Sequence, residues 1–505
     1  MRKIAMAVAL FAAVFASAYE GPTFTVSVWR GETAYAQIPG KFAGEMLQVE
    51  GIDDGMEQSG VGVELYGLNM VCYDTTPGGS FLNARRDVLR PMAHAKTKED
   101  GYCYMPPAFC RVVAAPDAKP GERQFGPLVV RVVDRALPPP KDWKYFLDLW
   151  QHPWAVARFA GAEPFSEQHY QAMEPVWRAL AESGVKALTV TLLDLPWNHQ
   201  CYDAYHSMVG RVKTADGKWK FDYSVFDSYV EFGRKCGIGP DIACYTMCPW
   251  GYVVRWQDEK GETHRAKAVP GTPEFEEFWG DFLVDFAAHL KAKGWFDDAY
   301  IAMDERSPED VHNIALFIQK KVPGMKISMA GNRKPSDFKD IVIDNYSQSL
   351  THMTPDFLPE LALRREKGWK TTFYVCCSPE RPNTFMASPD GEGFWIGAYP
   401  ALVGFDGFLR WAANSWPHDP YVDASFGDWK AGDTYLIYPG GELSARLVAL
   451  RAGIVAAEKL RILRESGALG DEVTVLADEF GYKAAMSGKL NFGAFRRKVE
   501  ALVNR

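Results

Sequence analysis

The chain has 505 residues, a formal net charge of −8 and 13% aromatic residues. This length allows two domains with a sizeable core. The acidic balance argues against binding to nucleic acid or to an anionic membrane surface, because both carry negative charge. After the first residues, no stretch has the unbroken apolar length of a membrane span.

The first 18 residues have the three parts of a secretory signal peptide. Arg2 and Lys3 give a charged start, Ile4–Phe15 form an apolar run, and Ala16–Ala18 form a small-residue cleavage site. The apolar run is too short to favour a transmembrane helix. We therefore expect an exported protein, periplasmic or secreted, that is cleaved after Ala18.

Residues 19–138 show short alternating runs separated by Gly and Pro, such as Leu128–Val133. This pattern predicts an N-terminal β-sandwich domain. It ends at Leu137–Pro140, a proline run that is typical of a stiff linker.

After the linker, apolar runs alternate with amphipathic stretches. Eight such units over residues 139–465 predict an α/β fold, a (β/α)8 TIM-like barrel, and residues 466–505 predict a helical C-terminal extension. A doubly wound open sheet is the alternative, but no Gly-rich phosphate turn follows the first strand. The expected strands are Tyr145–Leu149, Ala187–Leu193, Asp241–Thr246, Ala299–Met303, Lys326–Met329, Ile341–Ile343, Thr371–Val375 and Gly407–Trp411.

Asp304 and Glu305 directly follow the fourth expected strand. Burying a carboxylate is costly unless it is paired or hydrogen-bonded, and barrel active sites lie at the carboxyl ends of the strands. Alternatively, Asp304 caps the next helix and Glu305 is solvated. Successive strand residues point to opposite faces, so both acids reach one pocket only if the chain turns at Glu305. The sequence Arg306–Pro308 favours such a turn.

The pair suggests a particular glycosidase chemistry. Most retaining glycosidases use two acids from different strands, but the seventh expected strand ends in Cys376 and Cys377, and Glu380 lies on the following loop. A 2-acetamido sugar can supply its own nucleophile and form an oxazoline. Glu305 would then donate the proton and later activate water, while Asp304 would orient the acetamido group.

Other strand ends supply aromatic and amide side chains, which suit a carbohydrate pocket. The candidates for substrate binding are Trp197 and Trp411 as walls, Asn345, Asn414 and His199 as contacts to hydroxyls, and Tyr346 as a hydroxyl donor to the acetamido carbonyl.

The chain has nine Cys. Cys244 and Cys248 are four residues apart, but no nearby His or Cys pair completes a zinc pattern. Cys376 and Cys377 are adjacent. We expect no metal and no cofactor.

Several blocks of sequence carry a family resemblance: Pro196–Asp203, Gly217–Asp227, Tyr300–Glu305, Gly407–Trp416, Gly432–Gly440 and Ser444–Arg446. In these blocks the chain resembles glycoside hydrolase family 123, the β-N-acetylgalactosaminidases. The resemblance covers most of the mature chain. It implies a β-sandwich followed by a (β/α)8 catalytic domain, and substrate-assisted retention with Asp304 and Glu305 as the acid pair. The family often has Pro after the Glu, where this chain has Arg306.

The expected activity is therefore exo-acting release of terminal β-linked N-acetylgalactosamine from a glycan or glycoconjugate. Two alternatives stay open at this point. One is a glycosidase of other sugar specificity that uses a protein nucleophile such as Glu380. The other is a non-catalytic carbohydrate-binding protein on the same scaffold. The sequence does not separate galacto from gluco preference or indicate an oligomeric state.

Overall fold

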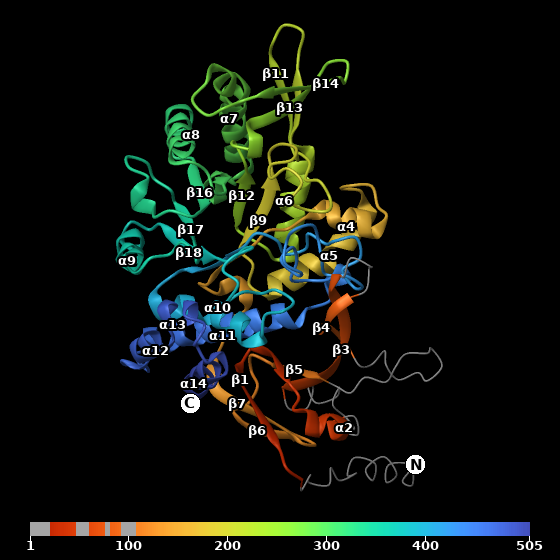
Figure 1. The fold of residues 1–505 in the computed structure, drawn as a ribbon, viewed down its shortest axis with the longest axis vertical. Helices are drawn as coiled ribbons and strands as arrows, with labels where there is room; N and C mark the ends of the chain where they lie inside the picture. The colour runs from red at the N-terminus through yellow and green to blue at the C-terminus, as the bar shows by residue number, and fades with distance from the viewer. Residues whose placement is uncertain (1–20, 47–59, 76–80, 92–107) are drawn as a thin grey trace, which may run out of the picture. The chain divides into compact units, whose positions relative to one another are not determined.

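The computed structural model describes residues 21–46, 60–75, 81–91 and 108–505 (Figure 1). The expected signal peptide lies outside these residues, so export stays a prediction. The chain forms two compact units. The first runs to Leu68, resumes over Arg90–Pro138 and includes the last two residues, and the second contains Asn69–Leu89 and Pro139–Val503. Within the described ranges, no helix has both the length and the apolar character needed to cross a bilayer.

Two N-terminal sheets confirm the predicted β-sandwich. A three-stranded sheet has the order β1-β7-β6, and a four-stranded sheet has the order β2-β5-β3-β4. Alternate residues of the strands point inward, so that Val28, Val63, Val112 and Val130 share one buried core. The strands are β1 (Phe24–Arg30), β2 (Thr33–Gln37), β3 (Val61–Thr75), β4 (Phe81–Pro91), β5 (Phe109–Ala114), β6 (Gly121–Phe125) and β7 (Leu128–Ala136).

The second unit contains the predicted barrel. Eight parallel strands follow the order β8-β19-β18-β17-β16-β15-β12-β9. Most of their residues are buried, as expected for strands covered on both faces. The strands are β8 (Phe146–Leu149), β9 (Ala187–Thr191), β12 (Asp241–Tyr245), β15 (Ala299–Met303), β16 (Lys326–Gly331), β17 (Asn345–Ser349), β18 (Lys370–Tyr374) and β19 (Gly407–Arg410).

The barrel is nearly closed where β8 meets β9. The backbone N–H of Lys186 donates to the carbonyl oxygen of Leu147 at 2.8 Å. Further along, the side-chain amide of Gln151 takes the place of a peptide group. It accepts from the Thr189 N–H at 2.8 Å and donates to the Ala187 carbonyl at 3.1 Å. The buried Gln151 therefore satisfies strand-edge groups that would otherwise be unpaired.

Helices follow most strands and cover the sheet (Figure 1). In the fully described stretch between β16 and β17, only a 3-10 turn, Pro335–Asp337, is present, so the fifth unit lacks the expected α-helix. The covering helices are α4 (Pro153–Ala160), α5 (Glu167–Glu182), α6 (Ser224–Cys236), α7 (Pro273–Lys293), α8 (Pro308–Lys321), α9 (Leu358–Glu366), α10 (Asp390–Val403) and α11 (Ala445–Glu465). Four further strands form a separate sheet: β10 (Gly210–Lys213), β11 (Trp219–Asp222), β13 (Val253–Asp258) and β14 (Thr263–Lys267).

The helical C-terminal extension is also confirmed. It consists of α12 (Glu472–Phe480), α13 (Tyr482–Met486) and α14 (Phe492–Val503). Helices α12 and α14 pack against α10, which in turn lies close against α11. Glycines allow this approach, because a Cβ on Gly397 would come within 2.4 Å of the Leu450 carbonyl oxygen.

The predicted position of the sixth barrel strand is wrong. Ile341–Ile343 precede the strand, which is instead β17, Asn345–Ser349. Its residues are buried although four of the five are Asn, Ser or Gln. A strand inside a barrel is expected to be an apolar run, and β17 has the polar sequence Asn-Tyr-Ser-Gln-Ser. Asn345 and Tyr346 therefore lie at the start of the strand and not at its carboxyl end.

Candidate active site

A cavity of about 150 Å³ lies at the carboxyl ends of the barrel strands. Asp304 and Glu305 both line it, together with the hydroxyl-bearing Tyr374. Aromatic side chains dominate the rest of the wall, which favours a ligand with flat apolar faces and polar edges. The remaining lining residues are Trp150, Trp197, Gln200, Trp250, Ala330, Cys376, Cys377, Leu409, Trp411 and Trp429.

Both acids reach the cavity because regular strand geometry ends before them. Strand β15 stops at Met303, and the chain bends at Glu305. Ser307 then caps α8 by accepting a hydrogen bond from the Asp310 N–H at 3.1 Å. The turn expected after the pair is therefore present, and it is Ser307 that caps the helix.

Asp304 is held by two side chains. Trp250 Nε1 donates to Oδ2 at 2.5 Å, and Arg306 Nη2 lies 2.7 Å from Oδ1. Arg306 also lies over the Trp250 ring at 4.9 Å. The contact between Arg306 and Asp304 is an ion pair without hydrogen-bond geometry. Among the described residues, none donates a hydrogen bond to Oδ1. Burial raises the pKa of Asp304 to about 6, although Arg306 and Trp250 oppose that increase.

Glu305 has different neighbours. Tyr374 Oη donates to Oε1, and Asn332 Nδ2 donates to Oε2 at 3.3 Å. Burial and the nearby Glu305 raise the pKa of Tyr374, so the phenol stays a neutral donor. The two acids thus share a cavity but have separate sets of donors.

The aromatic walls are fixed from behind. Trp150 stacks on Trp197 with ring centroids 5.0 Å apart, and Trp150 also packs against Tyr245 at 4.4 Å. On the other side, the Trp411 and Trp429 rings lie 5.7 Å apart. Such packing limits the rotation of the rings, so the shape of the cavity is largely pre-formed.

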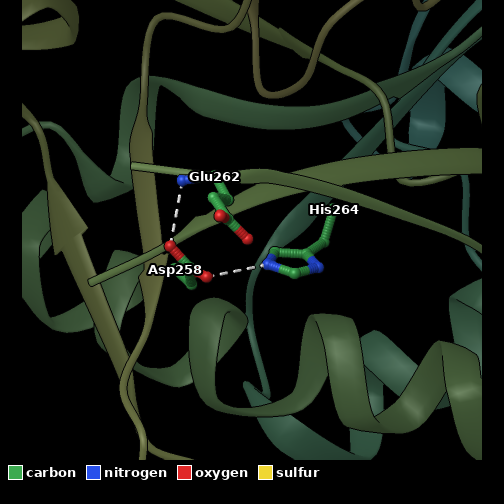
Figure 2. Close-up of side chains that lie close together, drawn as sticks. All are labelled: Asp258, Glu262 and His264. Carbon is green, nitrogen blue, oxygen red and sulfur yellow. Dashed lines mark hydrogen bonds and ion pairs between the residues drawn. The ribbon is translucent and has the colours of Figure 1, made fainter. Parts of the chain in front are cut away.

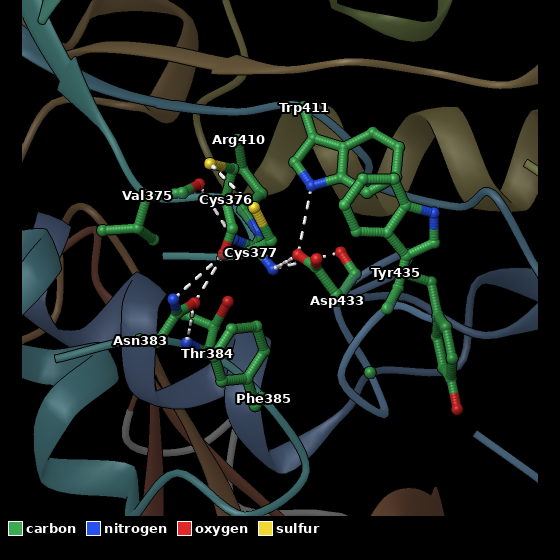
Figure 3. A network of polar contacts seen from close by, with 12 residues as sticks. Val375, Cys376, Cys377, Asn383, Thr384, Phe385, Arg410, Trp411, Asp433 and Tyr435 are labelled. Atoms are coloured by element: carbon green, nitrogen blue, oxygen red, sulfur yellow. Dashed lines mark hydrogen bonds and ion pairs between the residues drawn. The ribbon is translucent and has the colours of Figure 1, made fainter. Parts of the chain in front are cut away.

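A buried ion pair supports the strand-seven side of the cavity (Figure 3). The Arg410 guanidinium donates to Asp433 Oδ1 at 2.5 Å and to the Val375 carbonyl at 2.8 Å. Trp411 Nε1 donates to the same Asp433 oxygen at 3.1 Å. Both charged side chains are fully buried. Arg410 therefore connects the loop after β18 to a Trp of the cavity wall.

The structure brings together some of the predicted substrate-binding residues. Trp197 and Trp411 line the cavity with the acid pair. His199 is exposed and lies outside the lining. Asn414 is fully buried, and its amide exchanges hydrogen bonds with the backbone of His152 at 2.9 and 3.0 Å. Asn414 therefore joins two loops and does not face the cavity.

Asn345 and Tyr346 also lie outside the lining. Tyr346 Oη donates to the Arg333 carbonyl, and the guanidinium of Arg364 from α9 lies 5.9 Å from the Tyr346 ring. The side chain therefore points toward the helix layer. Tyr346 was expected near a strand end because the sixth strand was predicted at Ile341–Ile343, before its actual position.

Nine lining residues were not among the candidates, and five of them have aromatic or amide side chains. Tyr374 is the last residue of β18, Trp150 directly follows β8, and Trp250 lies on the loop after β12, so the strand ends and the loops after them are the signal that marks these residues. Gln200 follows the exposed His199. Trp429 comes from the long loop after β19, and no local pattern in the sequence marks it.

One group of side chains in the described part of the chain has metal-ligand chemistry. Asp258, Glu262 and His264 place their ligand atoms within 4.8 Å of one another at the β13–β14 hairpin (Figure 2). Asp258 is already engaged, because it accepts the Glu262 N–H at 2.9 Å and contacts His264 Nε2 at 3.1 Å. These hydrogen bonds stabilise the hairpin turn and explain why the three side chains lie close together.

Comparison with known proteins agrees with this geometry. The family model for the catalytic domain of glycoside hydrolase 123 matches residues 150–463. A solved family 123 glycoside hydrolase from Clostridium perfringens, studied for glycolipid glycan hydrolysis, has a TM-score of 0.78 at 21% identity, over 95% of this chain and 93% of that chain. A family 39 glycoside hydrolase from Bacteroides cellulosilyticus WH2 has a TM-score of 0.37 at 11% identity, over 86% and 82% of the two chains. None of the curated proteins compared with this chain matches it.

The family model covers more than half of the chain and includes all the residues that line the cavity. The Clostridium perfringens structure shares the fold of both units. The chain belongs to glycoside hydrolase family 123.

Proposed function

We propose that this glycoside hydrolase releases terminal β-linked N-acetylgalactosamine by a substrate-assisted retaining mechanism with an oxazoline intermediate. One observation carries the proposal: the two carboxylates that line the cavity are neighbours on one strand end. A second strand supplies no carboxylate to the described lining. A protein nucleophile on the opposite side of the sugar is therefore lacking, whereas the 2-acetamido group of the substrate can take that role.

Glu380 was the alternative nucleophile. Its side chain is 80% exposed, pairs with Lys430 at 3.1 Å, and lies outside the cavity lining. A nucleophile must lie next to the anomeric carbon, on the face opposite the leaving group. The position of Glu380 therefore favours substrate assistance over a glycosyl-enzyme intermediate.

The surroundings of the acids suggest their roles. Asp304 lines the cavity and is oriented by Trp250, which donates to Oδ2, and by Arg306, which lies 2.7 Å from Oδ1, so the carboxylate is held in place for the acetamido N–H. With a pKa of about 6, Asp304 is mostly ionised at neutral pH and can stabilise the positive charge that develops on the oxazoline. Glu305 acts as the proton donor and later activates water.

Tyr374 takes the role that the sequence assigned to Tyr346. Among the described residues that line the cavity, Tyr374 is the tyrosine, and its hydroxyl contacts Glu305. When the substrate binds, this O–H can turn from Glu305 and donate to the acetamido carbonyl as the oxygen moves toward the anomeric carbon. The small cavity and its Trp walls suit one terminal sugar ring, with the remainder of a glycoconjugate outside.

Hydrolysis of three matched aryl glycosides tests the proposal. The substrates are the β-N-acetylgalactosaminide, the β-N-acetylglucosaminide and the β-galactoside, each with wild type and Asp304→Asn. We expect turnover of the acetamido sugars only, with the galacto sugar preferred, and a strong loss in the variant. Efficient hydrolysis of the β-galactoside would refute substrate assistance, and preference for the gluco sugar would refute the proposed specificity.

A further inference from the structure

Two adjacent thiols in the cavity wall have no part in the mechanism above. Cys376 and Cys377 follow β18 directly, two and three residues after Tyr374, and both line the cavity. Their Sγ atoms lie 3.8 Å apart. Cys377 is exposed and Cys376 is half-buried.

The pair differs from five of the other described cysteines, the half-buried Cys72 being the exception. Cys110, Cys201, Cys236, Cys244 and Cys248 are buried, and burial raises the pKa of each thiol. In contrast, the Cys376 thiol donates to Cys377 and lowers the pKa of Cys377 to about 7. The same contact and burial raise the pKa of Cys376. An accessible thiolate beside a second thiol is the arrangement in which thiol–disulfide exchange is fast.

The backbone of the pair is connected to the cavity wall. The Cys376 carbonyl accepts from Arg410 Nη1 at 3.2 Å and from Asn383 Nδ2 at 3.0 Å. Arg410 in turn holds Asp433, which accepts from Trp411 Nε1 (Figure 3). A rotation of the Cys376–Cys377 peptide would therefore disturb contacts that position Trp411.

We propose that Cys376 and Cys377 are a redox-active dithiol, a modification site for low-molecular-weight disulfides, and that its closure to an intramolecular disulfide alters the catalytic cavity. The Cys377 thiolate attacks one sulfur of the oxidant, forms a mixed disulfide and releases one thiolate. Cys376 then loses its proton to solvent, and its sulfur attacks Cys377 Sγ and releases the second thiolate. Two electrons pass from the cysteines to the oxidant, which is reduced to two thiols.

Closure has a structural consequence because adjacent cysteines form a small ring. The two sulfur atoms must move from 3.8 Å to bonding distance, about 2.05 Å, which requires the intervening peptide to turn. That turn weakens the hydrogen bonds from Arg410 and Asn383 to the Cys376 carbonyl. Oxidation is therefore expected to move Trp411 and to slow hydrolysis, the latter effect resting on the proposed function.

The test treats folded protein with oxidised glutathione and analyses non-reduced peptides by mass spectrometry. Wild type should lose two hydrogen atoms on the peptide that contains both cysteines. Cys376→Ser should keep a glutathione adduct on Cys377, since the second step is blocked, and Cys377→Ser should stay unmodified at Cys376. A lasting glutathione adduct on wild type, or equal modification of Cys377→Ser, would overturn the dithiol.

Activity and fluorescence complete the test. Oxidised wild type should hydrolyse the aryl β-N-acetylgalactosaminide at least about fivefold more slowly and recover on reduction, because small displacements in an active site are costly. Cys72→Ser, a matched change of a half-buried thiol, should keep the wild-type response. If no glycoside is hydrolysed, the proposed function fails, while peptide mapping and tryptophan fluorescence still decide the dithiol. A disulfide that leaves both rate and fluorescence unchanged would refute the effect on the cavity.

Discussion

Two pairs of carboxylates lie on the barrel strands or directly after them. At the carboxyl ends of the strands, Asp304 and Glu305 line a cavity and receive hydrogen bonds from Trp, Tyr and Asn side chains, and Arg306 also pairs with Asp304. Elsewhere in the sheet, Asp148 of β8 and Asp241 of β12 are also buried, and Lys370 Nζ lies 2.5 Å from Asp241 Oδ2. The second pair does not line this cavity.

The comparison shows that burial does not by itself identify a catalytic acid. Burial raises the pKa of Asp148 to about 7 and that of Asp304 to about 6. Burial thus raises the pKa of an acid outside the cavity as well as that of the proposed catalytic acid. The difference lies in access to a ligand, because Asp304 and Glu305 line the cavity whereas Asp148 and Asp241 do not. The predictions below test this distinction.

The largest effect is expected for Glu305→Gln. Loss of the proton donor should reduce kcat by about 10²–10⁴-fold without unfolding the protein. Asp148→Asn is the matched control, since it also neutralises a buried acid of the barrel. Circular dichroism confirms folding, and steady-state kinetics gives the rates. Equal loss in both variants would abolish the distinction between the two pairs.

A smaller loss is expected for Tyr374→Phe. A hydrogen bond to a charged group contributes about 1.5–3 kcal/mol, so kcat should fall roughly 10–100-fold. Tyr346→Phe removes a hydroxyl that contacts the Arg333 carbonyl outside the cavity and should leave kcat within about twofold of wild type. The opposite order of the two variants would restore Tyr346 as the substrate contact.

Arg306→Met should shift the pH profile. Wild-type activity is expected to fall as pH drops through about 6, because Asp304 becomes protonated there. Arg306 lowers the pKa of Asp304, so its removal should move the acid limb of kcat/KM upward by about one pH unit. The other titratable groups facing Asp304 are Glu305, Tyr245 and Cys248, and the latter two are neutral near pH 7.

The control for this shift is Arg265→Met, which removes an exposed arginine from β14. Its acid limb should coincide with that of wild type. An unchanged limb in Arg306→Met would show that the ion pair does not determine the ionisation of Asp304.

The smallest effect concerns stability. The pKa of Asp148 is higher in the folded than in the unfolded protein, so the folded state binds more protons between about pH 4 and 7 and loses stability as pH rises through that window. Asp148→Asn removes this loss. Its free energy of unfolding at pH 8 should exceed that of wild type by roughly 1–2 kcal/mol, with little difference near pH 4. Urea titration at both pH values measures the change, and a less stable variant at pH 8 would contradict it.

The sequence predicts the architecture well where packing is local. Apolar runs reveal seven of the eight barrel strands, and the run before Asp304 places the acid pair at a strand end. The polar strand β17 is missed because it lies between β16 and β18, where its Asn, Ser and Gln residues are buried. This burial depends on the tertiary fold, and the local sequence pattern does not predict it.

The site is predictable only in part for the same reason. Trp197 and Trp411 could be predicted because Trp197 lies shortly after one apolar run and Trp411 ends another. Trp429 reaches the cavity from a long loop, and the ion pair between Arg306 and Asp304 depends on how the turn after β15 folds. Contacts of these kinds are set by the three-dimensional arrangement and not by spacing along the chain.

The central claim is that the substrate supplies the nucleophile. Aryl β-N-acetylgalactosaminides whose acetyl group carries one, two or three fluorine atoms test this mechanism. Fluorine withdraws electrons and lowers the nucleophilicity of the acetamido carbonyl oxygen, and the leaving group stays the same. A substrate-assisted mechanism predicts that the kcat/KM of wild type falls steeply with each added fluorine. A rate that is independent of fluorination would contradict it and would require a nucleophile from the protein.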